Sequence, residues 1–253
     1  MPSPSALFID AFSDTAERYA QSRPTYPPAL FAALAAQSPA RSCAWDCGTG
    51  NGQAALPLTE YFEIVQATDA SAEQIAHAAA HPRLRYAVRT AEDCGLPTAS
   101  VDLISVAQAA HWFDLPKFFA EVRRVARPGA VLALYGYDWF YMNRRLDALA
   151  QSFLWQPTST FWSPNNRLLW DGYRTIDFPF EELPRLRCAI HLSWTLDQLF
   201  DFYVTVSSTR RKIAADGDAF LHVAREQLTA AWGDPAKPRH VVMPMHVRWG
   251  RVS

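Results

Sequence analysis

The order of apolar segments between residues 42 and 135 constrains the fold of this chain more than any other feature. Short apolar runs alternate there with amphipathic segments, and glycine, proline or helix-capping residues separate them. The pattern predicts strands over residues 42–47, 64–70, 84–90, 101–106 and 130–135, and helices over residues 27–37, 51–62, 71–80 and 115–126. Such alternation is typical of an α/β fold with a parallel sheet that helices cover on both faces.

The second half of the chain departs from this alternation. Residues 139–185 are rich in aromatic side chains and contain no clear strand, whereas residues 186–194 and 241–252 alternate again like strands, with helical segments between them. We therefore expect three parts. Residues 1–138 form the core of the sheet, residues 139–185 form an insertion over its ligand edge, and residues 186–253 complete the sheet.

Charge and cysteine usage exclude several classes of protein. The chain has 24 Lys and Arg against 25 Asp and Glu, so it lacks the positive excess of a nucleic-acid binder. No apolar run approaches the roughly 18 residues of a membrane span, and the first ten residues do not resemble a signal peptide. The four cysteines have neither metal-ligand nor CxxC spacing. We expect a cytoplasmic protein with reduced thiols and with no metal, membrane or nucleic-acid partner.

Glycines are scarce, and three of them fall within five residues. Of ten in the chain, Gly48, Gly50 and Gly52 lie where the first strand passes into a helix. Glycines at such a turn let the backbone approach a ligand closely, and the free N–H groups of a helix start attract anionic groups. A dinucleotide fingerprint would need its third glycine at position 53, which is Gln53, so the spacing speaks against a nicotinamide cofactor.

The same window resembles motif I of the class I S-adenosylmethionine (SAM) methyltransferases. In that D-x-G-x-G-x-G pattern the acid is Asp46 and the glycines are Gly48, Gly50 and Gly52. The resemblance implies a Rossmann-like sheet that is mostly parallel with an antiparallel last strand, SAM as cofactor and S-adenosylhomocysteine as product. A second acid, Asp69, ends the second strand, where a carboxylate can accept both ribose hydroxyls.

Further segments resemble one branch of that family, the trans-aconitate methyltransferase-like branch (methyltransferase type 11). They are Tyr19-x-x-x-Arg23-Pro24-x-Tyr26-Pro27, residues 107–114 after the fourth strand, Gly136-Tyr137, and residues 247–251. Together with motif I, the resemblance covers nearly the whole chain and is weakest over residues 139–185. The branch acts on varied small molecules, so it does not identify a substrate.

Motif, strand-end position and resemblance together give the candidate cofactor-binding residues. They are Tyr19, Arg23, Asp46, Gly48, Thr49, Gly50, Asp69, Ala70, Ala91, Glu92, Ala107 and Gln108. Arg23 is expected to pair with the SAM carboxylate, and a bidentate guanidinium suits that contact. Asp46 is expected near the SAM ammonium group, Glu92 or the backbone at Ala91 near the adenine, and Gln108 near the methionine portion.

His111 is the candidate catalytic residue. It follows the fourth strand at the ligand edge, and a histidine can titrate near neutral pH. A general base, a substrate contact and a purely structural histidine all remain open for it. The candidate substrate-binding residues are His111, Trp112, Tyr137, Trp139 and Trp162, because small-ligand pockets are mostly apolar.

We therefore interpret the chain as a SAM-dependent methyltransferase, monomeric or homodimeric. Its predicted acceptor is the O or N of a small, planar or aromatic metabolite, such as one of natural-product (secondary) metabolism. Alternatives within the family are a carboxyl O-methyltransferase of a small organic acid, a non-catalytic SAM-binding partner protein, and a nucleic-acid or protein methyltransferase. A nicotinamide-dependent oxidoreductase is the alternative from another family.

Overall fold

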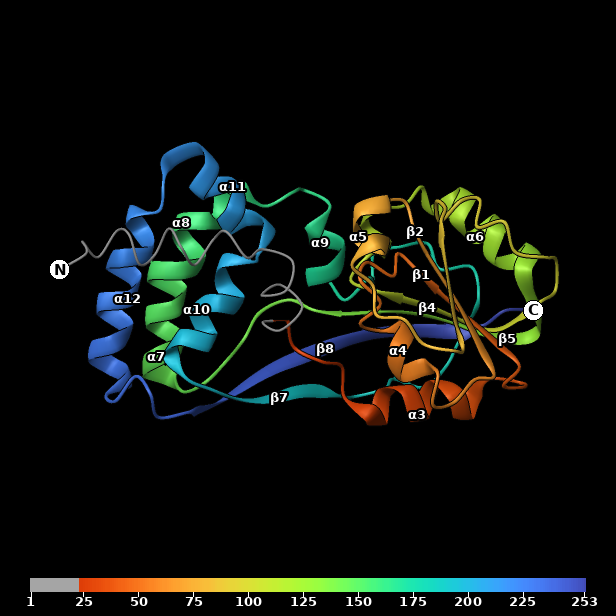
Figure 1. Ribbon diagram of the computed structural model, residues 1–253, viewed down its shortest axis with the longest axis horizontal. Coiled ribbons are helices and arrows are strands. Elements are labelled where there is room, and N and C mark those ends of the chain that lie inside the picture. The colour runs from red at the N-terminus through yellow and green to blue at the C-terminus, as the bar shows by residue number, and fades with distance from the viewer. Residues whose placement is uncertain (1–22) are drawn as a thin grey trace. The chain divides into compact units, whose positions relative to one another are not determined.

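The computed structural model describes residues 23–253, and Figure 1 shows the arrangement of their elements. The strands are β1 Cys43–Cys47, β2 Ile64–Asp69, β3 Leu84–Val88, β4 Val101–Ala107, β5 Ala126–Tyr137, β6 Glu181–Glu182, β7 Ala189–Trp194 and β8 Arg239–Arg251. The α-helices are α3 Pro28–Gln37, α4 Ala55–Leu58, α5 Ala72–Ala76, α6 Leu115–Val125, α7 Arg144–Ala150, α8 Gln156–Thr158, α9 Asn166–Trp170, α10 Leu196–Val204, α11 Ser207–Asp216 and α12 Ala219–Trp232. Short turns of other helix types are η2 Ala110–Trp112, η3 Gln151–Trp155 and η4 Ser159–Phe161.

The strands form one mixed sheet in the order β3-β2-β1-β4-β5-β8-β6, with β7 also paired to β8. Strands β1 to β5 are parallel, and β8 runs antiparallel to β5, with Gly136 opposite His246. The predicted fold class, a Rossmann-like α/β sheet with an antiparallel final strand, is confirmed. The carboxyl ends of the five parallel strands therefore lie along one edge of the sheet.

Helices cover both faces of this sheet. On one face, Phe118, Phe119 and Val122 of α6 join Ile104 and Leu132 of the central strands in one buried apolar cluster. Helix α3 packs against β5 on the other face, so the central strands lie between α6 and α3 (Figure 1). Since both faces are buried, β4 is apolar along almost its whole length.

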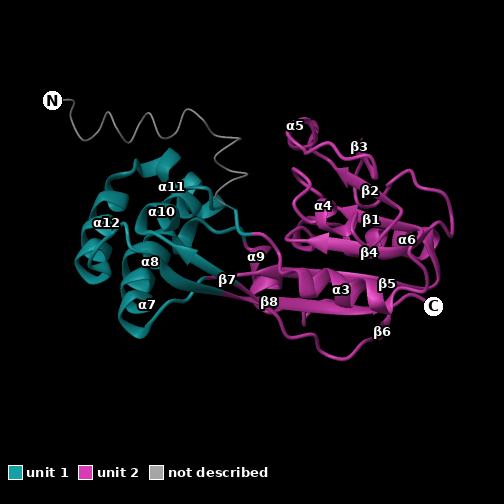
Figure 2. Cartoon of the chain, turned by 60° about the horizontal axis from the view of Figure 1, so that its bottom comes forward, with its two compact units in different colours: residues 1–24, 140–163, 191–242 teal, residues 25–139, 164–190, 243–253 magenta. Residues whose placement is uncertain are grey.

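The chain forms two compact units, which Figure 2 colours separately. Among the described residues, unit 1 comprises residues 23–24, 140–163 and 191–242. Unit 2 comprises residues 25–139, 164–190 and 243–253 and includes strands β1 to β6. The boundaries between the units fall after residues 24, 139, 163, 190 and 242, whereas we expected three consecutive parts with boundaries after residues 138 and 185. The predicted insertion is shared between the units, because residues 164–190 group with the sheet.

Unit 1 is mainly helical. The hydroxyl of the buried Tyr203 in α10 donates to the carbonyl of Leu154, and this bond ties α10 to η3. Thr195 and Gln198 form a capping box that starts α10. The helical segment that follows β7 is divided, because Val206 is extended and separates α10 from α11.

Some predicted elements are shorter or longer than observed. The helix predicted over residues 51–62 is reduced to α4, because residues 50–54 form turns in which Gly50 and Gly52 have positive φ. The helix predicted over residues 71–80 ends at Ala76, although Ser71 caps it as expected. Strand β5 begins at Ala126, which pairs with Val101, rather than at residue 130.

Residues 23–253 lack two kinds of feature, a membrane-spanning helix and a cluster of metal-binding side chains. None of the helices there is both long and apolar enough to cross a membrane. No group of three or more His, Cys, Asp or Glu side chains in the same residues could hold a metal ion.

Candidate functional site

The glycine turn follows β1 at the carboxyl edge of the sheet, and its three glycines have different roles. All three have positive φ: +69° at Gly48, +56° at Gly50 and +88° at Gly52. A Cβ at Gly48 would lie 2.5 Å from the Cβ of Ala109, and one at Gly52 would overlap the Tyr86 hydroxyl. A Cβ at Gly50 would meet only Gln74, at 3.8 Å. Gly48 and Gly52 are therefore required for packing, whereas the backbone at Gly50 is open to a ligand.

The amides of this turn bind within the protein. Gly48 N and Thr49 N both donate to the carbonyl of Thr68, at 2.8 and 2.9 Å. Gly50 N donates to one carboxylate oxygen of Asp69 at 2.8 Å, and Ser71 N donates to the other at 2.8 Å. The expectation that these N–H groups are free for the cofactor does not hold for Gly48, Thr49 and Gly50. Instead, Asp69 joins the glycine turn to the end of β2.

Asp46, the acid of the motif, is fully buried. Its carboxylate accepts from the hydroxyls of Thr49 at 2.7 Å and Ser105 at 2.9 Å, and the Tyr135 hydroxyl lies 2.8 Å from that of Ser105. Burial raises the pKa of Asp46 to about 6. Asp46 thus holds the inside of the turn through Thr49 and Ser105, and its predicted place near the SAM ammonium group stays a prediction.

The segment after β3 contains the candidate adenine-contacting residues. Ala91 is buried, and Glu92 accepts a hydrogen bond from the backbone N–H of Asp114 at 2.9 Å. Glu92 therefore connects this segment to the start of α6. Ala70, directly after Asp69, is exposed.

Gln108 follows Ala107 at the end of β4 in a strained conformation. It has a φ of +56°, which is uncommon for a non-glycine residue and clusters at functional sites. Its side-chain amide donates to the carbonyl of Tyr137 at 2.8 Å, and its Oε1 would lie 2.8 Å from a Cβ at Gly136. Gln108 therefore joins the ends of β4 and β5, and Gly136 makes room for it.

His111 and Trp112 lie next to each other in η2, in contrasting environments. His111 is only 5% exposed, and its Nδ1 has no hydrogen-bond partner among the residues that the structure describes. Burial lowers the pKa of His111 to about 4, so the ring is neutral at pH 7. Trp112 is 51% exposed, with its ring 4.9 Å from the imidazole. A neutral polar group thus lies beside an exposed aromatic surface at the carboxyl end of β4.

Three tyrosines at this edge, Tyr26, Tyr135 and Tyr173, were not among the predicted site residues. The Tyr26 ring lies 5.3 Å from that of Tyr135 and 6.4 Å from that of Tyr137, and burial raises the pKa of Tyr26 well above its usual value. Tyr173 is fully buried and has a φ of +60°, and its hydroxyl has no partner within the described part of the chain. A strained residue with an orphaned hydroxyl is a functional candidate. Only the tyrosine of the Arg-Pro-x-Tyr motif gave a sequence signal for this group.

Some predicted residues are not brought together in unit 2. Tyr19 lies outside the described residues. Arg23 belongs to unit 1, where it donates to the carbonyl of Thr205 at 3.1 Å and lies over the ring of Phe202. Trp162 also belongs to unit 1, where its ring lies against that of Trp155 in a tilted arrangement, with ring centroids 5.7 Å apart. The predicted ligand contacts of these residues stay predictions.

The other predicted substrate residues belong to unit 2. Tyr137 ends β5 and is buried, and Trp139 follows two residues later and is half-buried. Together with His111 and Trp112, they follow the carboxyl ends of the neighbouring strands β4 and β5. Four of the five candidate substrate residues therefore lie at one edge of the sheet.

Comparison with known proteins identifies the family. Residues 45–134 match the methyltransferase domain family. A Dictyostelium discoideum protein that bears the name methyltransferase is 30% identical over 236 residues, which are 92% of this chain and 89% of that protein. A Mycobacterium tuberculosis protein, named as an uncharacterized methyltransferase, is 36% identical over 137 residues, about half of each chain (54%).

A solved structure agrees with these matches. A protein from Anaeromyxobacter dehalogenans, described as a type II methyltransferase, superimposes with a TM-score of 0.86 at 43% identity and covers 91% of this chain and 98% of that one. A second structure, from Anabaena variabilis, has a TM-score of 0.52 at 20% identity and supports the fold alone.

The residues at the edge also fit the cofactor of this family. A carboxylate offers about four lone-pair positions, and the two backbone N–H groups on Asp69 leave acceptor capacity for the ribose hydroxyls of SAM. The open backbone at Gly50 lies beside that carboxylate. The nicotinamide alternative is set aside by the family matches and by Gln53 in the glycine spacing, since a ribose acceptor such as Asp69 would serve either cofactor. The chain belongs to the class I SAM-dependent methyltransferases.

Proposed function

We propose that this enzyme methylates an O or N atom of a small, planar or aromatic metabolite held beyond the carboxyl ends of β4 and β5. The observation that carries the proposal is the pair formed by the buried, neutral His111 and the exposed Trp112. Large apolar side chains exposed at the ligand edge of an α/β sheet are typical of a small-molecule site. A flat acceptor can stack on the indole of Trp112 while its polar atom meets the imidazole.

Asp69 and Gly50 hold the cofactor in this proposal. SAM, when bound, supplies a methyl group on a positively charged sulfur. Asp69 accepts from the ribose hydroxyls, and its two backbone hydrogen bonds keep the carboxylate oriented before the cofactor arrives. Gln108 fixes the end of β4 against β5, and so sets the direction from which the acceptor approaches.

His111 positions the acceptor. Its neutral ring can accept a hydrogen bond from a hydroxyl or amine, and its Nδ1 has no partner among residues 23–253. Because burial disfavours the imidazolium, net proton uptake by His111 is costly, and alignment of the acceptor is its main contribution. The orphaned Tyr173 hydroxyl is a second candidate for contact with the reacting groups.

A second candidate function is carboxyl O-methylation of a small organic acid, as the resemblance to the trans-aconitate methyltransferase-like branch implies. The lowered pKa of His111 favours it, because a carboxylate acceptor carries no proton for a base to remove. Residues 247–251, which resemble that branch, lie in β8 beside β5.

Calorimetry with SAM and with NAD, followed by a panel of acceptors, tests the proposal. We expect binding of SAM only, and transfer of labelled methyl to hydroxylated or amino aromatic compounds. Trp112→Ala should raise KM for such acceptors about tenfold, since an aromatic stack and its buried area are lost. The matched control is Val223→Ala, an exposed apolar residue of α12.

Two results would contradict the proposal. Turnover of aliphatic polycarboxylates alone would select the second candidate function. An unchanged KM in Trp112→Ala would remove the stacking role of the indole. His111→Gln separates the roles of the imidazole, because loss of kcat at every pH indicates positioning, whereas loss of a pH-dependent limb indicates a base.

A further inference from the structure

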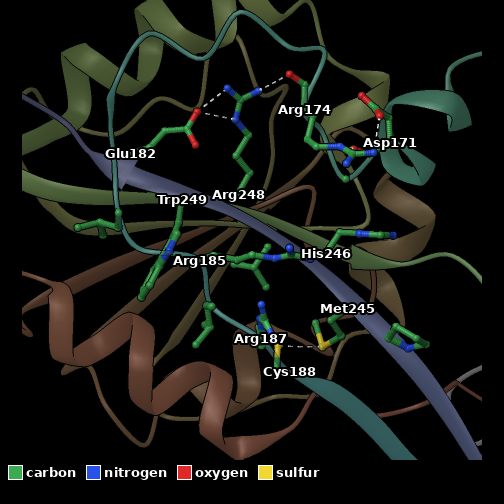
Figure 3. Close-up of a pocket in the computed structure, with 15 residues that line it drawn as sticks. Asp171, Arg174, Glu182, Arg185, Arg187, Cys188, Met245, His246, Arg248 and Trp249 are labelled. Atoms are coloured by element: carbon green, nitrogen blue, oxygen red, sulfur yellow. Dashed lines mark hydrogen bonds and ion pairs between the residues drawn. The ribbon is translucent and has the colours of Figure 1, made fainter.

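A cavity of about 580 Å³ lies in unit 2, outside the glycine turn. Its walls come from residues 171–174, from residues 182–188 and from the part of β8 that covers residues 244–249. Figure 3 shows these residues as sticks on either side of β8. Small-molecule sites have volumes of roughly 300–1,000 Å³, so the cavity is large enough for a metabolite.

The path of the backbone creates the cavity. Leu183 N donates to Trp249 O at 3.0 Å, and Met245 N donates to Cys188 O at 3.1 Å, so the segment is fixed to β8 at both ends. Between these bonds, residues 184–187 make no backbone hydrogen bond to β8. We call the walls of this cavity together, residues 171–174, 182–188 and 244–249, the arginine arch. The N–H groups of successive residues in a strand point to opposite edges. The N–H of Val247 therefore points to the same edge as that of Met245, toward the cavity.

The arginine arch has more positive than negative charge. Four arginines and two carboxylates line the cavity. One carboxylate, Glu182, binds Arg248 through two guanidinium nitrogens at 2.6 and 3.1 Å, and the other, Asp171, binds Arg174 at 2.9 Å. The two remaining guanidinium groups, of Arg185 and Arg187, have no ion-pair partner among the described residues.

The four arginines of the cavity are not equally free to bind a ligand. The Nη1 of Arg248 donates to the carbonyls of Tyr173 and Ile176, so this arginine is held by the turn over residues 173–176 and is unavailable for a ligand. Arg185 and Arg187 are exposed and two residues apart in a non-helical segment, so both can present their guanidinium groups to the same ligand. Figure 3 shows them between the segment and β8.

The remaining walls supply a polar corner and an apolar floor. His246 lies 3.2 Å from a carboxylate oxygen of Asp138, and its ring is so close to Gly172 that a Cβ there would lie 3.1 Å from Nδ1. Met245 and Trp249 are largely buried, and the indole N–H of Trp249 donates to the carbonyl of Pro184. The ring and the indole are thus held in place before any ligand binds.

We propose that the arginine arch is a binding site for a small polyanion, a molecule with a phosphoryl group or with two or more carboxylates. Two uncompensated guanidinium groups offer paired N–H donors that match such oxygens, and the backbone N–H of Val247 adds a donor from the opposite wall. The apolar floor accommodates the carbon skeleton of the ligand. This site is independent of Asp69, so it does not rest on the methyl-transfer proposal.

Calorimetry of the full chain, in a buffer without polyanions, tests the site with two probes, citrate and inorganic phosphate. We expect at least one of them to bind with one-to-one stoichiometry. The double variant Arg185→Gln/Arg187→Gln should weaken that binding about tenfold or more, because charge-assisted hydrogen bonds are lost. The matched control is Arg41→Gln, an exposed arginine that precedes β1 at the other end of the parallel strands.

The outcomes separate the ligand classes and decide the proposal. Binding of citrate alone identifies a polycarboxylate site, and binding of phosphate alone identifies a phosphoryl site. The proposal is overturned if neither probe binds to the wild type, or if the double variant binds as tightly as the wild type does. SAM binding, measured on each variant, should stay unchanged, which shows that the variants are folded and keeps this test separate from that of the proposed function.

Discussion

Two regions of unit 2, the glycine turn with Asp69 and the arginine arch, differ in whether their charged groups are already bound within the protein. In the turn, the carboxylates of Asp46 and Asp69 are already bound by hydroxyls and backbone amides of the protein. In the arch, the carboxylates bind two arginines and leave Arg185 and Arg187 without an ion-pair partner among the described residues. The turn is therefore organised for one partner before binding, whereas the arch attracts ligands by its charge.

The largest expected effect comes from disturbing the tight packing of the turn. Gly52→Ala places a methyl group on the Tyr86 hydroxyl at a φ of +88°, and we expect it to lower the free energy of unfolding by about 3 kcal/mol. Gly50→Ala has the strain but no overlap and should cost about 1 kcal/mol. Urea denaturation measures both. Equal losses for the two variants would show that packing against Tyr86 does not distinguish these glycines.

The second effect follows from the neutrality of His111. In the folded state its pKa of about 4 lies below the usual 6.5, so between these values the unfolded chain takes up a proton that the folded chain does not. Stability should therefore fall as the pH is lowered through this window. Between pH 8 and pH 4.5 the wild type should lose about 2–3 kcal/mol more than His111→Gln does. Parallel pH profiles for the two proteins would rule out a neutral, buried imidazole.

The third effect concerns cofactor binding. Asp69→Asn keeps the shape of the side chain but removes its charge, and it should weaken SAM binding by about 2 kcal/mol, roughly thirtyfold. Calorimetry with SAM measures this loss. The control is Arg185→Gln, which changes the arch and should bind SAM as the wild type does. Loss of SAM affinity in the control instead of in Asp69→Asn would show that SAM binds at the arch and not at Asp69.

The smallest effect is a salt dependence that differs between the regions. Arg185 and Arg187 are exposed, so added salt should screen their attraction for citrate and weaken its binding by less than about tenfold up to 0.15 M NaCl. SAM binding at the half-buried Asp69 should change less over the same range. Titrations at several salt concentrations make the comparison. If the affinities for citrate and SAM fell equally with salt concentration, the exposure of the charged groups would not explain the difference between the two regions.

Much of the glycine turn could be predicted from the sequence because its signals are local. The spacing of Gly48, Gly50 and Gly52 and the position of Asp69 one strand later indicate a ligand edge without any knowledge of packing. The burial of Asp46 could not be predicted, because it depends on Ser105 and Tyr135, which come from two later strands.

The arginine arch could not be predicted for a related physical reason. The sequence shows many arginines, but whether one is paired depends on distant segments, and Arg248 finds Glu182 across 66 residues. The arch also requires residues 184–187 to leave the edge of β8 between two backbone hydrogen bonds. Neither the periodicity nor the composition of the sequence predicts those hydrogen bonds. Similarly, the start of β5 at Ala126 is set by its pairing with Val101 rather than by its own propensity.

The position of β8 has a consequence for synthesis of the chain. Residues 239–242 of this strand belong to unit 1 and residues 243–251 to unit 2, where residues 245–251 pair with β5. Neither unit is therefore complete until the last strand has left the ribosome, even though the cofactor motif is made early. A chain that stops before residue 239 would leave both units unfinished, with the apolar edge of β5 uncovered and prone to association with other chains.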